Sequence, residues 1–75
     1  MELEDLVSLM VEAPERVRVH EHRQDRGTLF KLRLAEEDLG KVIGRQGRTA
    51  RALRTLLETR GELEDRDYVL EIREW

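Results

Sequence analysis

The chain has 75 residues, no cysteine, a net charge of −3, and slightly more charged residues (41%) than hydrophobic ones (39%). A chain this short forms one domain, residues 1–75, and its thin core leaves no apolar surface for a deep substrate cavity. The lack of cysteine excludes disulfides and thiolate sites for zinc or iron–sulfur clusters. With neither a basic leader nor a long apolar run, we expect a cytoplasmic protein that does not enter a membrane.

The first half of the chain predicts a helix followed by a β-hairpin. One helical face carries Leu3, Leu6, Val7 and Met10. Pro14 cannot continue that helix, which should therefore end near residues 11–13. Two runs then alternate apolar and polar residues with the period of a strand, namely Val17 and Val19, then Phe30, Leu32 and Leu34. The segment 24–27 between these runs is a turn signal in which Gly27 is free to adopt a positive φ.

The second half predicts two helices and a closing strand. The first helix opens with the acids of residues 36–38, which suit a helix N-terminus, and residues 44–47 interrupt it. The second helix should end near Gly61, and its expected inward residues are Ala50, Leu53, Leu56 and Leu57. After an acidic loop over 62–67, the strand is marked by Tyr68, Leu70 and Ile72. The element order αββααβ predicts an α+β fold of two packed layers.

The segment Gly44-Arg45-Gln46-Gly47 lies between two predicted helices, where each glycine costs about 1 kcal/mol relative to alanine. Glycine supplies a positive φ and a bare backbone that another molecule can approach closely. The helix after Gly47 begins with unpaired N–H groups and the positive end of its dipole. A phosphate could therefore lie along this segment beside Arg45 and Arg48. A plain turn between two helices explains the same glycines.

Basic residues gather around this segment. Residues 39–57 hold five bases and no acid, so the rest of the chain carries a charge of −8. The five bases are Lys41, Arg45, Arg48, Arg51 and Arg54. A local positive field binds polyanions whatever the net charge of the protein. The alternative is an arginine-rich helix face that is merely solvated.

The run Val42–Gly47, followed by a helix with Leu53, closely resembles the V-I-G-x-x-G signature of KH domains. The order αββααβ is similar to the bacterial type II KH arrangement, which implies a three-stranded mixed sheet with helices packed on one face. The resemblance places the loop Gly44–Gly47 over a nucleic-acid backbone. Strand residues near Phe30–Leu34 would then form the far wall of a groove. The residues implied to bind RNA are Leu39, Lys41, Val42, Ile43, Gly44, Arg45, Gln46, Gly47, Arg48 and Arg51.

The resemblance also implies a function and a partner. Small bacterial proteins made of a single KH domain grip short single-stranded RNA, so we expect an RNA chaperone or post-transcriptional regulator without catalysis, cofactor, metal or small-molecule substrate. Such a chain would pair with itself or with KhpB, a larger KH-containing protein. The alternative hypothesis is a protein–protein adaptor or dimerisation module, or a ribosome-biogenesis factor, on the same fold.

Three other features remain. The acidic loop 62–67 departs from the family pattern and should repel a phosphate backbone. His20 and His22 share one strand face, but without an evident third ligand we expect solvent-facing side chains rather than a metal site. Trp75 could anchor an interface or cap the edge of the sheet.

Overall fold

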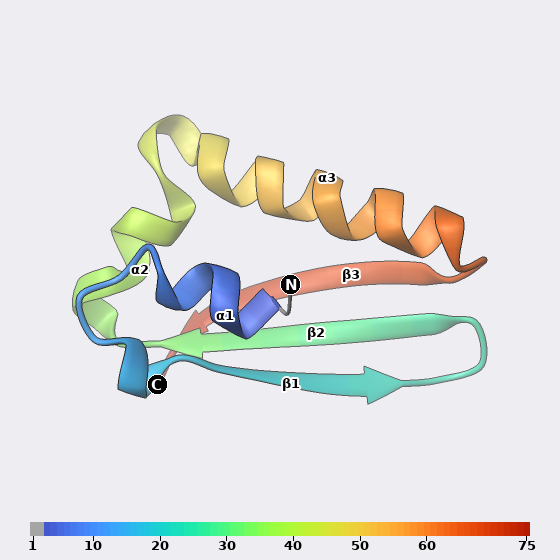
Figure 1. Ribbon diagram of the computed structural model, residues 1–75, viewed down its shortest axis with the longest axis horizontal. Coiled ribbons are helices and arrows are strands. Elements are labelled where there is room, and N and C mark those ends of the chain that lie inside the picture. Colours follow the sequence, from blue (N-terminus) through green and yellow to red (C-terminus); the bar gives the residue numbers. More distant parts are fainter. Residues whose placement is uncertain (1–2) are drawn as a thin grey trace.

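Three α-helices lie on one face of a three-stranded sheet in the computed structural model, which describes residues 3–75 (Figure 1). The elements in chain order are α1 (Leu3–Ser8), β1 (Arg18–Arg23), β2 (Gly27–Leu34), α2 (Glu36–Ile43), α3 (Arg48–Leu63) and β3 (Asp67–Glu74). Short 3-10 turns over Pro14–Arg16 and Arg45–Gly47 precede β1 and α3. The predicted α+β class and αββααβ order are confirmed.

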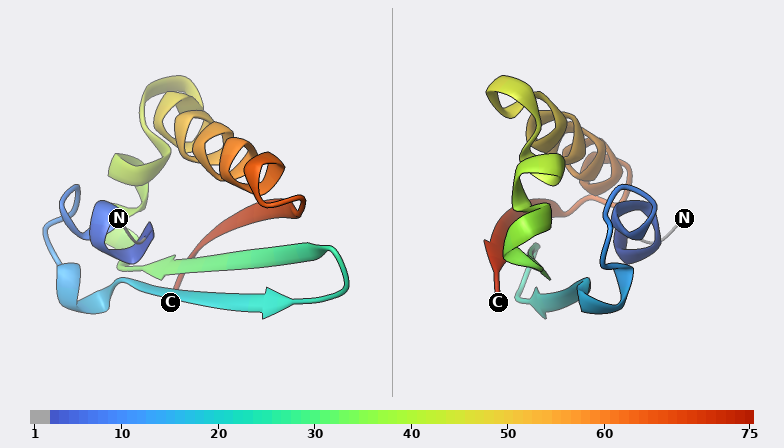
Figure 2. Two further views of the ribbon diagram at one scale, coloured as in Figure 1. Left: turned by 45° about the vertical axis from the view of Figure 1, so that its right-hand side comes forward. Right: turned by 90° about the vertical axis from the view of Figure 1, so that its left-hand side faces the viewer.

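The central strand of the sheet is β2. It runs antiparallel to β1, with Arg18 opposite Arg33, and parallel to β3, with Gly27 opposite Asp67. A parallel neighbour requires a crossover, and α2 with α3 supplies it across one face of the sheet. Figure 2 shows that no α-helix of residues 3–75 lies on the opposite face. The sheet is therefore mixed, as predicted, and it has one covered face and one open face.

The core lies between the helices and the covered face. It draws on every helix, β2, β3 and the residue before β1, and its members are Val7, Val17, Leu32, Leu34, Val42, Leu53 and Leu70. On β2, Leu32 and Leu34 alternate with half-exposed Lys31 and Arg33, which is the period of a strand with one face in the core. Within residues 3–75, no helix is long and apolar enough to span a membrane.

The first half of the chain corrects two predictions. Helix α1 ends at Ser8 rather than near residues 11–13, and the Ser8 hydroxyl donates 2.7 Å to the carbonyl of Glu4, a bond that competes with helix continuation. Pro14 instead begins a 3-10 turn, where its missing N–H is tolerated. Gly27 does not adopt a positive φ, because it already belongs to β2 and its carbonyl accepts from the Gln24 N–H at 2.9 Å.

The structure of α3 corrects three more predictions. It continues two residues past Gly61 to Leu63, which leaves only residues 64–66 as a loop. Leu56 is 59% exposed rather than inward, since the sheet beneath α3 covers only the side of the helix that carries Leu53 and Leu57. Gly61 is buried where the helix presses on the start of β3. There, an added Cβ would lie 3.2 Å from Tyr68 Cγ.

Candidate nucleic-acid interface

The glycine loop, residues Gly44–Gly47, joins α2 to α3 with three of its four residues at positive φ. The angles are 78° at Gly44, 56° at Gln46 and 73° at Gly47. The Gly44 N–H donates to the carbonyl of Gly40 at 2.8 Å and ends α2, and the Gly47 N–H donates to the carbonyl of Gly44 at 3.1 Å. Glycine tolerates this conformation without steric cost, whereas Gln46 is held in it by its surroundings.

The loop requires glycine at positions 44 and 47 for different structural reasons. A Cβ on Gly44 would lie 2.8 Å from Thr49 Cβ and 3.0 Å from Thr49 N, so the loop backbone presses directly on the first turn of α3. A Cβ on Gly47 would meet only Arg51 Nη1, at 3.6 Å. Gly44 therefore allows a close packing contact, while Gly47 is required mainly for its left-handed φ.

Two arginines of α3, Arg48 and Arg51, contact Gln46. Arg51 Nη2 donates to the backbone carbonyl of Gln46 at 2.9 Å, and Arg48 Nη2 lies 3.4 Å from Gln46 Oε1. Arg45, Arg48 and Gln46 are exposed, and the first turn of α3 holds no acid. The loop therefore offers a helix N-terminus, two accessible guanidinium groups and a backbone in an anion-binding type of turn. Arg51, predicted as a contact, also holds the loop in its conformation.

Lys41 differs from the other predicted basic residues. Its Nζ lies 3.1 Å from Glu12 Oε1 and 3.9 Å from Asp38 Oδ1, so acidic neighbours offset its charge. Of the predicted basic contacts, Arg45, Arg48 and Arg51 are the exposed cations at the loop, and Arg51 already donates to the Gln46 carbonyl.

Asp38 has a role that sequence reasoning missed. Its carboxylate is 1% exposed and accepts from the N–H of Glu12 at 3.1 Å and of Ala13 at 3.0 Å. It therefore fastens the chain after α1 to the first turn of α2, the helix that leads into the glycine loop. One signal could have indicated this burial, because Asp38 lies four residues before the buried Val42 and so on the same helical face.

The predicted apolar groove is narrower than expected. Ile43 is 36% exposed and Leu39 is half-buried, but Val42 is fully buried and can only support the groove from beneath. The prediction that Phe30–Leu34 form its other wall is wrong, because β2 is the central strand and β3 separates it from the free edge beside α3. That edge presents Val69, which is 58% exposed.

The acidic loop lies far from the glycine loop. The two occupy opposite ends of α3, as Figure 1 shows, and the helix between them has 16 residues, or about 24 Å at 1.5 Å per residue. Charges on the surface are screened over about 8 Å at physiological salt. The acids at 62–65 therefore have little effect on a phosphate held at Gly44–Gly47.

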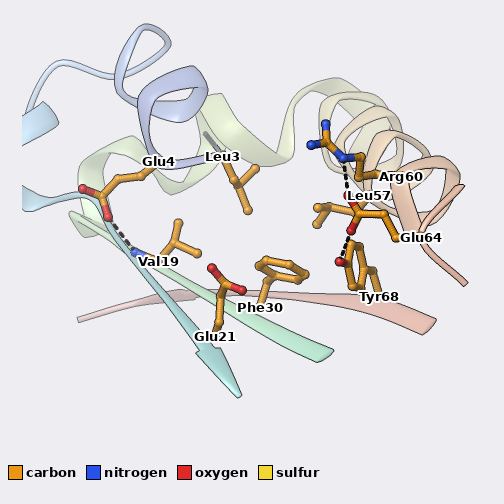
Figure 3. A pocket seen from close by; sticks show the side chains of 9 residues that line it. All are labelled: Leu3, Glu4, Val19, Glu21, Phe30, Leu57, Arg60, Glu64 and Tyr68. Atoms are coloured by element: carbon orange, nitrogen blue, oxygen red, sulfur yellow. Dashed lines mark hydrogen bonds and ion pairs between the residues drawn. The ribbon is translucent and has the colours of Figure 1, made fainter. Parts of the chain in front are cut away.

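A second hollow of about 250 Å³ lies between α1, α3 and the sheet (Figure 3). Two of its three carboxylates have protein partners, the third being that of Glu21: Glu4 accepts from the Val19 N–H at 3.1 Å, and Glu64 accepts from the Tyr68 hydroxyl and from Arg60 Nε at 2.7 Å. The bond from Tyr68, followed by that from Arg60, lowers the pKa of Glu64 below its usual value. This acid-rich pocket is unsuited to a phosphate.

The described residues also bear on the histidine pair. Within residues 3–75, no group of three or more side chains could hold a metal ion. His20 and His22 are both exposed, with ring centroids 4.6 Å apart, so the expectation of solvent-facing histidines is confirmed.

Comparison with known proteins shows the family of the chain. A model of the KhpA/KhpB KH-domain family matches residues 2–72. The chain belongs to this family. Its relatives include the RNA-binding protein KhpA of Streptomyces coelicolor, 45% identical over 73 residues (89% of this chain, 92% of the relative). KhpA of Aquifex aeolicus is 43% identical over 76 residues (96% of each chain), and KhpA of Clostridium acetobutylicum is 39% identical over 70 residues (93% of each).

No solved structure gives a significant match. Membership of the KhpA/KhpB family confirms the KH-domain resemblance drawn from residues 42–47, and the observed element order agrees with the type II arrangement. It also confirms the prediction of a chain that is not an enzyme, since the relatives are named as RNA-binding proteins.

Proposed function

We propose that this chain binds single-stranded RNA by laying the phosphate backbone across the glycine loop. The observation that carries the proposal is the loop itself, a tight turn at positive φ that opens directly onto the N-terminus of α3 beside exposed Arg45 and Arg48. A phosphate there would meet backbone N–H groups and two guanidinium groups at once. The names of the relatives, RNA-binding protein KhpA, support it.

Base recognition by this site is weak. Leu39 and Ile43 offer a small apolar surface beside the loop, and no aromatic side chain stands in the segment to stack on a base. Affinity would come mainly from phosphates, which position a strand without reading its sequence. Loose binding of many RNAs suits a cytoplasmic RNA chaperone or post-transcriptional regulator, and sequencing of RNA cross-linked to the protein in cells would test that role.

We also propose that α3 pairs the chain with a second copy or with a KhpB-like protein. Leu56 and Leu63 are 59% and 81% exposed on α3, beside a hollow of about 440 Å³ that Leu3 and Leu6 also line. Sedimentation of the Leu56→Lys variant tests the pairing. We expect a monomer where the parent chain sediments as a dimer, and a monomeric parent would contradict self-pairing.

The RNA site is tested by replacing Arg45 and Gln46 together with Asp. Both glycines remain, and an acid before a helix N-terminus is favourable to the dipole, so the fold should survive. Two negative charges would occupy the place of the phosphates, so we expect RNA affinity to fall at least about tenfold, or roughly 1.4 kcal/mol. Titration of labelled single-stranded RNA measures the change.

The chain offers a matched control in Arg23-Gln24, the same dipeptide at the β-hairpin. Replacing Arg23 and Gln24 with Asp makes the same change of charge away from the glycine loop, and RNA affinity should fall by less than about twofold. Equal losses in the two variants would show that net charge, rather than the loop, governs binding.

A further inference from the structure

The open face of the sheet carries an unusual arrangement of cations. Strand register places Arg18 opposite Arg33 and Arg33 opposite Arg73, which gives one row of three arginines across all three strands. The next row holds His20 and Lys31, with Glu71 as its acid. The other acid of this face, Asp67, lies at the far end of β3.

Like charges directly opposite one another destabilise a sheet, so this row has an energetic cost. Partners within the protein offset it only in part. Arg18 Nη1 donates to the carbonyls of Val17 at 2.6 Å and Glu15 at 3.2 Å, and Arg73 Nη1 lies 3.6 Å from Glu71 Oε1. The guanidinium carbon of Arg33, Cζ, lies 5.6 Å from the centroid of the Trp75 ring. An anionic ligand would relieve the repulsion.

The cations surround a hollow. It measures about 490 Å³, and the residues that line it, none of them Asp or Glu, are Arg18, Val19, His20, His22, Lys31, Arg33 and Trp75. Trp75 is 55% exposed, and its Nε1 donates to the carbonyl of Arg16 at 2.6 Å, which fixes the indole at the rim. The hollow therefore combines positive charge with a fixed aromatic ring and two exposed imidazoles.

We propose that this open face binds a second stretch of single-stranded RNA, with phosphates at Arg18, Lys31 and Arg33 and a base against Trp75. The acidic side chains of a peptide would use the cations but have no aromatic ring to stack on the indole and the imidazoles, whereas a nucleotide uses both. The site shares no residue with the glycine loop. It adds the aromatic platform that the loop lacks.

Trp75 reports directly on this site, because it is the only tryptophan of the chain. Oligouridylate of about eight nucleotides, twice the four that a KH loop clamps, is titrated while Trp75 emission and the anisotropy of the labelled RNA are both followed. We expect RNA to quench the emission in the parent protein. The same quenching is expected in the Arg45→Asp/Gln46→Asp variant, whose open face is intact.

The test variant is Arg18→Gln/Lys31→Gln, which removes two cations and leaves the contact between Arg33 and Trp75 in place. We expect the midpoint of quenching to move to about tenfold higher RNA, because two phosphate contacts are lost. The control, Arg23→Gln/Arg26→Gln, removes the same charge at the hairpin end, where Arg26 makes an exposed ion pair. Its midpoint should stay within about twofold of the parent value.

Three results would overturn the proposal. They are RNA binding by anisotropy without any change in emission, loss of quenching together with binding in the glycine-loop variant, and quenching by polyglutamate as strong as that by RNA. A different result would remove the function proposed for the loop and leave this site standing: unchanged anisotropy in the glycine-loop variant with quenching intact. The two proposals therefore fail separately.

Discussion

At each end of α3 a residue other than glycine has a left-handed backbone conformation, and different contacts hold it there. At each end the chain reverses through a residue other than glycine in the left-handed region, Gln46 with φ 56° before the helix and Asp65 with φ 55° after it. Gln46 is held by one backbone contact from Arg51 and a weak side-chain contact from Arg48. Asp65 is followed by Arg66, whose guanidinium donates to the carbonyls of Asp25, Gln24 and Gly27 and to Thr28 Oγ1.

This difference distinguishes a strained turn that supports the fold from a strained turn that is available to a ligand. At the C-terminal end, the polar groups of the turn are used to join α3 to the β-hairpin, so little remains for a ligand. At the N-terminal end, the cations lie beside exposed backbone and have few internal partners. Backbone strain of this kind persists where its surroundings enforce it, and the number of internal partners indicates which turn is structural.

The largest losses of stability should come from adding a methyl group to the glycine at either end of α3, Gly44 or Gly61. Gly44→Ala meets both a positive φ and the contact with Thr49, and we expect it to lower the free energy of unfolding by about 2–4 kcal/mol. Gly61→Ala meets Tyr68 and the carbonyl of Arg66, although alanine suits a helix better by about 1 kcal/mol, so we expect a loss of about 1–3 kcal/mol.

The two variants differ in binding. Urea denaturation gives the stabilities, and RNA titration at a temperature where both are folded gives the affinities. Gly44→Ala should weaken RNA binding because the glycine loop must shift, while Gly61→Ala should leave it within about twofold of the parent. A Gly61→Ala variant that binds as poorly as Gly44→Ala would show that the two ends are coupled.

The arginine that holds each turn gives the next largest effect. Arg66→Gln removes several bonds between α3 and the hairpin, and we expect a loss of about 2 kcal/mol with unchanged RNA affinity. Arg51→Gln removes one exposed bond and should cost less than about 1 kcal/mol, yet weaken RNA binding severalfold. Thermal unfolding and the same RNA titration check both, and the reverse ranking in either assay would contradict the comparison.

The smallest effect is a pH dependence confined to the C-terminal end. The hydrogen bond from Tyr68 to Glu64 raises the pKa of Tyr68 and, with Arg60, lowers that of Glu64. The raised tyrosine contributes stability below its unfolded pKa, and the contribution is lost as pH rises past about 10. The lowered carboxylate contributes above its unfolded pKa, and the contribution is lost as pH falls below about 4.

Tyr68→Phe isolates this pair. The phenylalanine ring retains the edge-to-face contact with Phe30, whose centroid lies 5.0 Å away. The unfolding temperature of the parent should exceed that of the variant slightly between about pH 5 and 9, and the difference should close on both sides of that range. A difference that stays constant from pH 3 to about pH 11 would show that the lost hydroxyl acts through packing rather than titration.

The sequence predicted features that depend on local pattern. The period of two in Phe30, Leu32 and Leu34 gave a strand, and two glycines three residues apart between helical runs gave the loop at Gly44–Gly47. Glycine at a positive φ is a property of a few adjacent residues, so it can be read without knowing the rest of the fold.

Features that depend on distant partners could not be predicted. Asp38 looks like an ordinary acid at a helix N-terminus, but its acceptors are used by N–H groups 25 and 26 residues earlier in the chain. Leu56 lies on the apolar arc of α3, yet the width of the surface beneath a helix is set by the sheet and not by the helix. The predicted groove wall on β2 failed because sequence order does not say which strand is central.

The parallel pairing of β2 with β3 makes the completion of the sheet a long-range folding step. The ladder pairs residues about forty positions apart, as in Gly27 with Asp67, while β1 and β2 meet through a short local turn. Long-range closure is slow and comes after local pairing in most small domains. A chain released before Asp67 would leave every hydrogen-bonding group on one side of β2 unpaired, which is the kind of exposed strand edge that recruits other chains into aggregates.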